Sequence, residues 1–327
     1  MKSKLIQTKE LFKKEGGFGL IRQLHKTRIL SSVLGCSLFL GMSHKSLEIV
    51  RLIIQYKTKL RLKKRYNYVL RKCKEFDHSS LNKEQSNYVW ICWFQGIENA
   101  PLIVQKCVSS LKENLSDKKV TILNFENINE YVTFPPIINE KWEKGIISNT
   151  HLSDILRIEL LIKYGGTWID STVLCTGKNF PDYLFKSDLF FFQLLKPGLN
   201  GQSLSLSSWF ITSSSNNYIL LITRELIYEY WKKNKIMANY FLFHMFLEIV
   251  LDEFPEERKK IMKFCNSIPH MLLLDLFEPF DKEKFENVER LTAFHKLNYK
   301  FDTEKFLLKG TFYDEIFNNN FINSKNP

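Results

Sequence analysis

The sequence has no pair of cysteines at the spacing of a disulfide framework or of a CxxC motif. Its six cysteines lie inside apolar runs or singly among charged residues, at positions 36, 73, 92, 107, 175 and 265. Secreted disulfide scaffolds and structural zinc sites both require closely patterned cysteines. We therefore expect reduced thiols in a cytosolic protein.

The sequence also lacks a convincing membrane span. An apolar run from Ile29 to Met42 has about fourteen residues and is interrupted by Ser and Gly, whereas a span needs roughly twenty residues. About 28 residues without a cleavage-like pattern precede this run, which argues against a removable signal peptide. No internal repeat is visible.

Acidic residues are scarce in the N-terminal quarter. Residues 1 to 75 contain 19 Lys and Arg but only 4 Glu, so this quarter alone exceeds the net charge of +12 carried by all 327 residues. Hydrophobic residues make up 44% of the chain and aromatic residues 14%, which excludes a disordered protein. The length allows one sizeable core with an appendage.

The basic quarter ends in a predicted amphipathic helix from Lys45 to Lys74, with apolar residues such as Leu47, Val50 and Ile54 opposite many cations. Such a helix suits the anionic inner face of a membrane. The same charge is compatible with nucleic-acid binding and with a helical cap packed on the main domain. A polar linker at 77–87 places the domain boundary near residue 78.

The most informative stretch runs from Asn149 to Val173. Apolar residues recur at helical spacing from Ser153 to Tyr164, and Gly165 and Gly166 then predict a glycine-capped helix end. Asp154 and Arg157 lie three residues apart, so we expect them on one face of the first turn, near the positive helix end. A β-rich run, Thr167 to Ile169, stops at Asp170, where α/β sheets place ligand chemistry.

Simpler interpretations exist for each of these residues. Asp154 and Arg157 could form an ordinary structural ion pair, and Asp170 could end a strand in a turn. If the pair grips a ligand, replacing Asp154 should cost activity and little stability. The order helix, Gly-Gly, aromatic, apolar, Asp is rarer than any of its members.

Taken together, Ser153-Asp154-x-x-Arg157, Lys163-Tyr-Gly-Gly166 and Trp168-Ile-Asp-Ser-Thr172 resemble the signature of the capsular-polysaccharide-synthesis glycosyltransferases. These are relatives of the GT-A sugar transferases with a DXD sugar-binding motif, similar to glycosyltransferase family 32. The resemblance covers about residues 88 to 300. It implies an α/β, GT-A-like nucleotide-sugar-binding fold with a mixed central sheet, preceded by an N-terminal helical extension.

The resemblance also implies a donor site. Trp93, at the end of an apolar strand that continues to Gly96, would stack on the nucleobase, although a core aromatic is the simpler alternative. Asp154 and Arg157 would hold donor hydroxyls, and Asp170 the ribose and a metal. Thr172 would contact the donor. Lys296, in a segment similar to the family's terminal "KL" segment, would lie near the diphosphate, unless it is a solvated surface cation.

The resemblance further implies a divalent metal, Mn²⁺ or Mg²⁺, on the donor diphosphate. A full DXD motif has a second carboxylate where this chain has Thr172, so Asp170 would anchor the metal, with His244 as a second ligand. His244 resembles a recurrent family histidine, but a lone His on an apolar helix is more often a core residue.

These expectations describe three parts: a basic, membrane-facing helical extension over 1–78, a glycosyltransferase domain over 79–317 and a frayed tail over 318–327. The enzyme would transfer a hexose from a nucleotide diphosphate sugar, UDP-linked by expectation and with retention of configuration, to a lipid-linked oligosaccharide. It would act on capsular or other surface polysaccharide, peripherally at the inner face of a bacterial membrane, beside other polysaccharide-synthesis enzymes.

The alternative from another class is a non-catalytic, transferase-like binding module docked at the membrane in a polysaccharide assembly complex. The departure at Thr172 keeps this alternative open. A nucleic-acid partner is not expected, because residues 76–327 are slightly acidic and lack a basic groove pattern.

Overall fold

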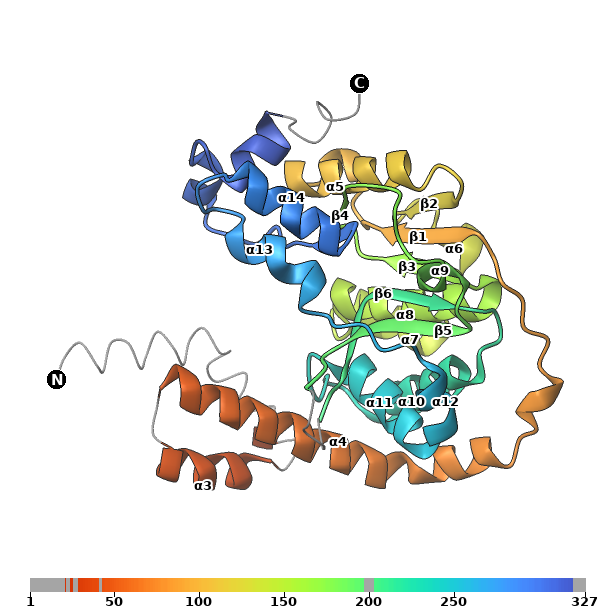
Figure 1. The fold of residues 1–327 in the computed structure, drawn as a ribbon. Helices are drawn as coiled ribbons and strands as arrows, with labels where there is room; N and C mark the ends of the chain where they lie inside the picture. Colours follow the sequence, from red (N-terminus) through yellow and green to blue (C-terminus); the bar gives the residue numbers. More distant parts are fainter. Residues whose placement is uncertain (1–20, 22–23, 26–28, 41–42, 197–202, 320–327) are drawn as a thin grey trace.

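The computed structural model describes residues 21, 24–25, 29–40, 43–196 and 203–319. Within these ranges, the helices α3 and α4 precede an alternation of strands and helices (Figure 1). The strands are β1 (Tyr88–Cys92), β2 (Lys119–Leu123), β3 (Gly166–Ile169), β4 (Val173–Cys175), β5 (Leu189–Gln193), β6 (Leu206–Ser213) and β7 (Phe294–Lys296). The α-helices are α3 (Leu30–Leu40), α4 (His44–Lys74), α5 (Leu102–Asn114), α6 (Ile128–Tyr131), α7 (Pro136–Glu143), α8 (Asn149–Tyr164), α9 (Tyr183–Lys186), α10 (Tyr218–Lys233), α11 (Leu242–Glu253), α12 (Pro255–Lys260), α13 (Met271–Asp275) and α14 (Lys282–Leu291).

Five strands form a mixed sheet in the order β2-β1-β3-β6-β5, and β4 pairs with β7 in a separate ribbon. β1 runs parallel to β2 and to β3. β6 runs antiparallel to β3 and to β5. This mixed α/β architecture behind N-terminal helices confirms the fold class predicted from the sequence.

Helices cover both faces of the sheet, as the alternation along β1 shows. Successive side chains of a strand point to opposite faces. Trp90 packs in one core cluster with Leu156 of α8. Val89 and Ile91 pack in another, which contains apolar residues of α5. All of these side chains are nearly or fully inaccessible to solvent, so β1 is buried on both faces.

The predicted buried helix and its glycine end are confirmed, with one correction at the start. The hydroxyl of Ser148 accepts the backbone N–H of His151 and caps α8, so the helix begins four residues before Ser153. Asp154 and Arg157 therefore lie beyond the first turn. Gly165 and Gly166 have φ of +65° and +90°, which other residues rarely adopt. With any other residue at position 166, a Cβ would lie 2.4 Å from the Tyr88 carbonyl oxygen. Glycine is therefore needed for β3 to pair with β1 as it does.

The parallel pairing of β3 with β1 determines the edge of the sheet at which the candidate residues meet. Because β1 and β3 are parallel, their carboxyl ends lie at one edge. Trp93 follows β1 and Asp170 follows β3 at that edge. The β4–β7 ribbon, in which Val173 pairs with Lys296, brings the distant C-terminal segment to the same place.

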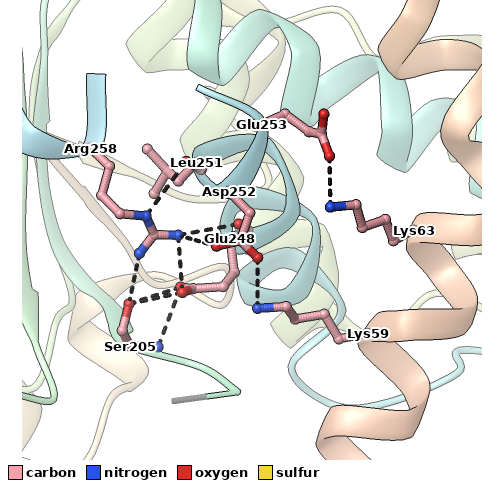
Figure 2. A network of polar contacts seen from close by, with 8 residues as sticks. All are labelled: Lys59, Lys63, Ser205, Glu248, Leu251, Asp252, Glu253 and Arg258. Atoms are coloured by element: carbon pink, nitrogen blue, oxygen red, sulfur yellow. Dashed lines mark hydrogen bonds and ion pairs between the residues drawn. The ribbon is translucent and has the colours of Figure 1, made fainter. Parts of the chain in front are cut away.

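The second half of α4 belongs to the main core. Tyr66 and Leu70 are at most 1% exposed and pack in the cluster that contains α8, α10 and α11. Figure 2 shows the adjacent ion pairs: Lys59 Nζ lies 2.9 Å from Asp252 and Lys63 Nζ 2.6 Å from Glu253, both on α11. Part of the basic charge thus stabilises the negative end of α11. For this half of α4, the packed-cap alternative is correct.

The division into 1–78 and 79–317 stays a prediction, because α4 contributes to both parts. Most of the predicted frayed tail lies outside the described residues, which end at 319. All six cysteines are free thiols. No helix in the described ranges combines the length and the apolar character needed to cross a membrane.

Candidate functional site

Arg157 joins the two carboxylates singled out in the sequence. Its Nη1 donates to Asp154 Oδ1 at 2.9 Å, and its Nη2 donates to Asp170 Oδ1 at 3.3 Å. Its guanidinium lies over the ring of Trp168, 4.7 Å from the centroid. Arg157 is 3% exposed and Asp154 7%. The pair is therefore a buried ion pair and not a surface one.

Asp170 is the most accessible carboxylate of this group, with 30% of its side chain exposed. Its Oδ1 also accepts the indole N–H of Trp168 at 3.0 Å, and its Oδ2 lies 3.3 Å from Lys296 Nζ. Lys296 in turn donates to the hydroxyl of Thr172. The structure thus brings Arg157, Asp170, Thr172 and Lys296 together, which makes Lys296 a member of the cluster and not a free surface cation.

Two residues missed in the sequence lie behind Asp154. The indole N–H of Trp231 donates to His151 Nε2 at 3.0 Å, so His151 Nε2 is an acceptor and Nδ1 carries the proton. Nδ1 faces Asp154 Oδ2 at 3.4 Å. Burial opposes ionisation of Asp154, but the His151 hydrogen bond and the Arg157 charge outweigh it and lower the pKa of Asp154. The only sequence signal was the position of His151, three residues before Asp154 on one helix.

The charges of Asp154, Arg157 and Asp170 also act on His244, which lies on α11. Burial lowers the pKa of His244 to about 4, against the opposing charge of Asp154. His244 is therefore neutral near pH 7, and its buried Nδ1 makes no hydrogen bond with any described residue.

The residues present do not fit a divalent metal held by Asp170 and His244. Hard cations prefer several oxygen ligands, but both oxygens of Asp170 already face cationic side chains, Arg157 and Lys296. Across the ranges that the structure describes, no three His, Cys, Asp or Glu side chains gather as they do in a metal site made by the protein alone. The positive charge of this cluster comes from the protein itself.

Trp93 and Gly96 lie at the same edge of the sheet. In the described structure, no hydrogen bond joins either residue to the cluster. Trp93 is half-buried, and its ring packs edge-on against Tyr299 at 5.2 Å between centroids. Gly96, with φ of +83°, closes a turn by donating its N–H to the Trp93 carbonyl. Tyr299 follows Lys296 by three residues, so Trp93 flanks the segment that carries Lys296.

Tyr240 is a further residue that the sequence did not single out. Partial burial, followed by the negative charges of Asp154 and Asp170, raises the pKa of Tyr240. The residue is 60% exposed. An exposed phenol this close to two carboxylates can contact a ligand that the cluster binds.

Residues 42–316 match the family described as "Capsular polysaccharide synthesis protein". The match covers far more than half of the 327 residues. The chain belongs to this family. The candidate cluster, from Asp154 to Lys296, lies inside the matched range, and so does α4. The family expected from the motifs is therefore confirmed, and its relation to the GT-A, DXD-type and family-32 transferases stays a prediction.

Two curated proteins resemble part of this chain. "Glycosyltransferase afumC" from Aspergillus fumigatus is 28% identical over 95 residues, which is 26% of this chain and 24% of that protein. "O-glycosyltransferase braB" from Annulohypoxylon truncatum is 33% identical over 92 residues, which is 25% of this chain and 22% of that protein. The chain thus spans about a quarter of the length of these relatives.

Among solved structures, "PaToxG Glycosyltransferase" aligns with a TM-score of 0.36 and 16% identity, over 64% of this chain and 83% of that one. A similarity this weak carries no argument about the site.

Proposed function

We propose that this protein is a glycosyltransferase. It would move a hexose from a nucleotide diphosphate sugar, UDP-linked in our proposal, to a lipid-linked oligosaccharide during capsular or other surface polysaccharide synthesis. The family membership and the two partial relatives named as glycosyltransferases support the reaction class. Retention of the anomeric configuration stays a prediction from the family resemblance.

The observation that carries the proposal is the cluster of Arg157, Asp170 and Lys296 at the carboxyl edge of the sheet. Asp170 Oδ2 lies 3.3 Å from Lys296 Nζ, and 30% of the Asp170 side chain is exposed. Carboxylate oxygens accept hydrogen bonds from sugar hydroxyls, and cationic groups bind phosphate oxygens. One cluster can therefore recognise both parts of a nucleotide sugar.

Each residue has a role in the proposed reaction. Asp170 accepts hydrogen bonds from hydroxyls of the donor. Lys296 stabilises the charge that develops on the departing diphosphate. Arg157 adds positive charge beside them, and Asp154 holds Arg157 in place as a buried positioning residue. Trp93, at the neighbouring strand end, would stack on the nucleobase. Gly96 and Thr172 shape the turn and the hydroxyl lining of the site.

A panel assay tests this proposal. The full-length protein is incubated with UDP-, GDP-, ADP-, CDP- and dTDP-linked hexoses, and the release of nucleoside diphosphate is measured. We expect release from one donor class, lost in Asp170→Asn although the variant stays folded. Tight donor binding without release or transfer to any saccharide acceptor would instead identify the non-catalytic binding module.

We expect EDTA to leave donor turnover within about twofold of its original rate, because Arg157 and Lys296 supply the charge that a metal would offer. The measurement is nucleoside diphosphate release with and without chelator, followed by addition of Mn²⁺ or Mg²⁺. Loss of turnover in EDTA and its recovery with Mn²⁺ would contradict this expectation. That result would support the metal predicted on Asp170 and His244.

We also propose that α4 docks on an anionic membrane surface at the inner face of the cell membrane through an exposed stripe from Ile49 to Leu60. Ile49, Leu52 and Leu60 are each more than 40% exposed although apolar, and Tyr56 lies between them on the same helical stripe. Exposed Arg51 and Lys57 accompany this stripe. Apolar residues flanked by cations bind anionic lipid interfaces.

The variant Ile49→Gln/Leu52→Gln/Leu60→Gln should reduce co-sedimentation with anionic vesicles several-fold, because it removes apolar area from the interface. The matched control is Leu274→Gln/Leu291→Gln/Leu307→Gln, which changes three exposed leucines of the C-terminal region. Equal sedimentation of both variants and the unaltered protein would refute the docking surface. Deletion of residues 1 to 75 is unsuitable, because it removes Tyr66 and Leu70 from the core.

A further inference from the structure

A strongly basic cavity lies between α4 and the end of α10 with the segment that follows it. Its volume is about 920 Å³. Five of its lining side chains are cationic: Arg61, Lys64, Arg65, Lys233 and Lys235. None of its described lining residues is acidic. None of them belongs to the Arg157–Asp170–Lys296 cluster, so this cavity is separate from the proposed donor site.

Much of this charge has no balancing carboxylate. Lys233 lies 3.4 Å from Glu229, and it also offsets the negative end of α10. Lys64, Arg65 and Lys235, in contrast, form no ion pair with any described residue. Like charges that converge on one cavity repel one another, and a bound anion relieves that repulsion. The arrangement therefore favours a multiply charged anion.

The volume of the cavity indicates the size of the anion that it can hold. Pockets of roughly 300–1,000 Å³ suit ligands the size of a nucleotide or a small saccharide, so a phosphate group alone would leave most of the space empty. One wall of the cavity is also connected to the buried Asp154–Arg157 pair. Tyr230 lines the cavity, and the next residue, Trp231, begins the hydrogen-bond chain through His151 to Asp154.

We infer that this cavity binds the diphosphate group of the phosphorylated saccharide that accepts the sugar, an inference that rests on the proposed transferase function. The cations of α4 and of the α10–α11 segment hold the phosphate oxygens, and the remaining volume holds the first sugar. A lipid-linked and a soluble saccharide diphosphate share this chemistry. The membrane-docking stripe, Ile49 to Leu60, lies on the same helix, α4, and ends where the cavity-lining segment, Thr58 to Arg65, begins.

The test uses inorganic diphosphate as the probe and Lys296→Met as the background, so that binding at the donor site does not contribute. Calorimetric titration compares this background with the added substitutions Lys64→Gln/Arg65→Gln/Lys235→Gln. The control adds Lys112→Gln/Lys263→Gln/Lys305→Gln, which removes the same charge from exposed positions elsewhere. We expect the cavity substitutions to weaken diphosphate binding by at least about tenfold and the control by less than about twofold.

Equal loss in both variants, or no loss in the cavity variant, would overturn the inference. Vesicles of neutral phosphatidylcholine with and without a polyprenyl diphosphate distinguish the two sources: retention only with the polyprenyl lipid assigns a lipid-linked ligand, and binding of free diphosphate alone assigns a soluble one. Donor hydrolysis with Lys296 intact should be unchanged by the cavity substitutions. If hydrolysis is absent from the start, the transferase proposal fails while the diphosphate titration still decides the cavity.

Discussion

We expect Lys296→Met to lower donor turnover by roughly 100-fold to 1000-fold while the protein stays folded, because removal of one preorganised group that stabilises developing charge typically costs this much. Lys296 Nζ lies 3.3 Å from Asp170 Oδ2 and is the cation at the exposed side of the cluster. The measurement is nucleoside diphosphate release at saturating donor, with far-ultraviolet circular dichroism as the test of folding.

Lys305→Met provides the control, since Lys305 is an exposed cation outside the cluster. Its turnover should match that of the unaltered protein. If Lys296→Met turns over at a normal rate, the leaving diphosphate is stabilised elsewhere, and the assignment of Lys296 fails. Lys296→Arg should recover part of the activity, because the charge is kept but its position shifts.

Asp154→Ala should lower the free energy of unfolding by about 3–5 kcal/mol, since loss of one partner leaves a buried charge uncompensated. Arg157 is 3% exposed. The substitution removes its 2.9 Å partner and leaves it only the 3.3 Å contact with Asp170. Turnover should fall as well, because Arg157 is no longer held. Urea unfolding at neutral pH, followed by any spectroscopic probe, measures the change.

The matched control is Asp182→Ala, which removes a carboxylate from an exposed i,i+4 pair with Lys186. Such pairs contribute about 0–1 kcal/mol. If Asp154→Ala is no more destabilising than the control, the buried pair does not hold the structure together. The sequence alone predicted little stability loss for Asp154, because burial of both partners could not be read from their spacing.

Local patterns identified the elements around the site correctly. The apolar spacing of α8, the Gly165-Gly166 end and the β-rich run before Asp170 are all encoded within one stretch of chain, so short-range rules apply to them. The start of α8 was placed too late, because Ser148 caps the helix without a Glu or Gln three residues on, which is the usual sequence signature.

The long-range parts of the site could not be derived from such patterns. Lys296 meets Asp170 only because β7 pairs with β4, and nothing in either short strand specifies that pairing. The resemblance to a family located Lys296, but not its two contacts. His151 and Trp231 meet 80 residues apart in sequence, and a donor-acceptor pair at that separation leaves no local signal.

The N-terminal charge shows a different difficulty. Composition located the basic quarter, but it could not divide the cations by role. Lys59 and Lys63 pair with α11, whereas Lys64 and Arg65 line the basic cavity. These neighbours on one helix differ only in the direction of their side chains, which depends on how α4 packs.

The most direct test of the proposed donor site is calorimetric titration of the full-length protein with UDP, and with GDP, ADP, CDP and dTDP in parallel, because it requires no knowledge of the acceptor. We predict that one nucleoside diphosphate binds with micromolar affinity, which corresponds to about −8 kcal/mol, and that both Lys296→Met and Asp170→Asn weaken this binding at least about tenfold. Failure of all five to bind, or equal affinity in the unaltered protein and both variants, would contradict the assignment of the Arg157–Asp170–Lys296 cluster as a nucleotide-sugar site.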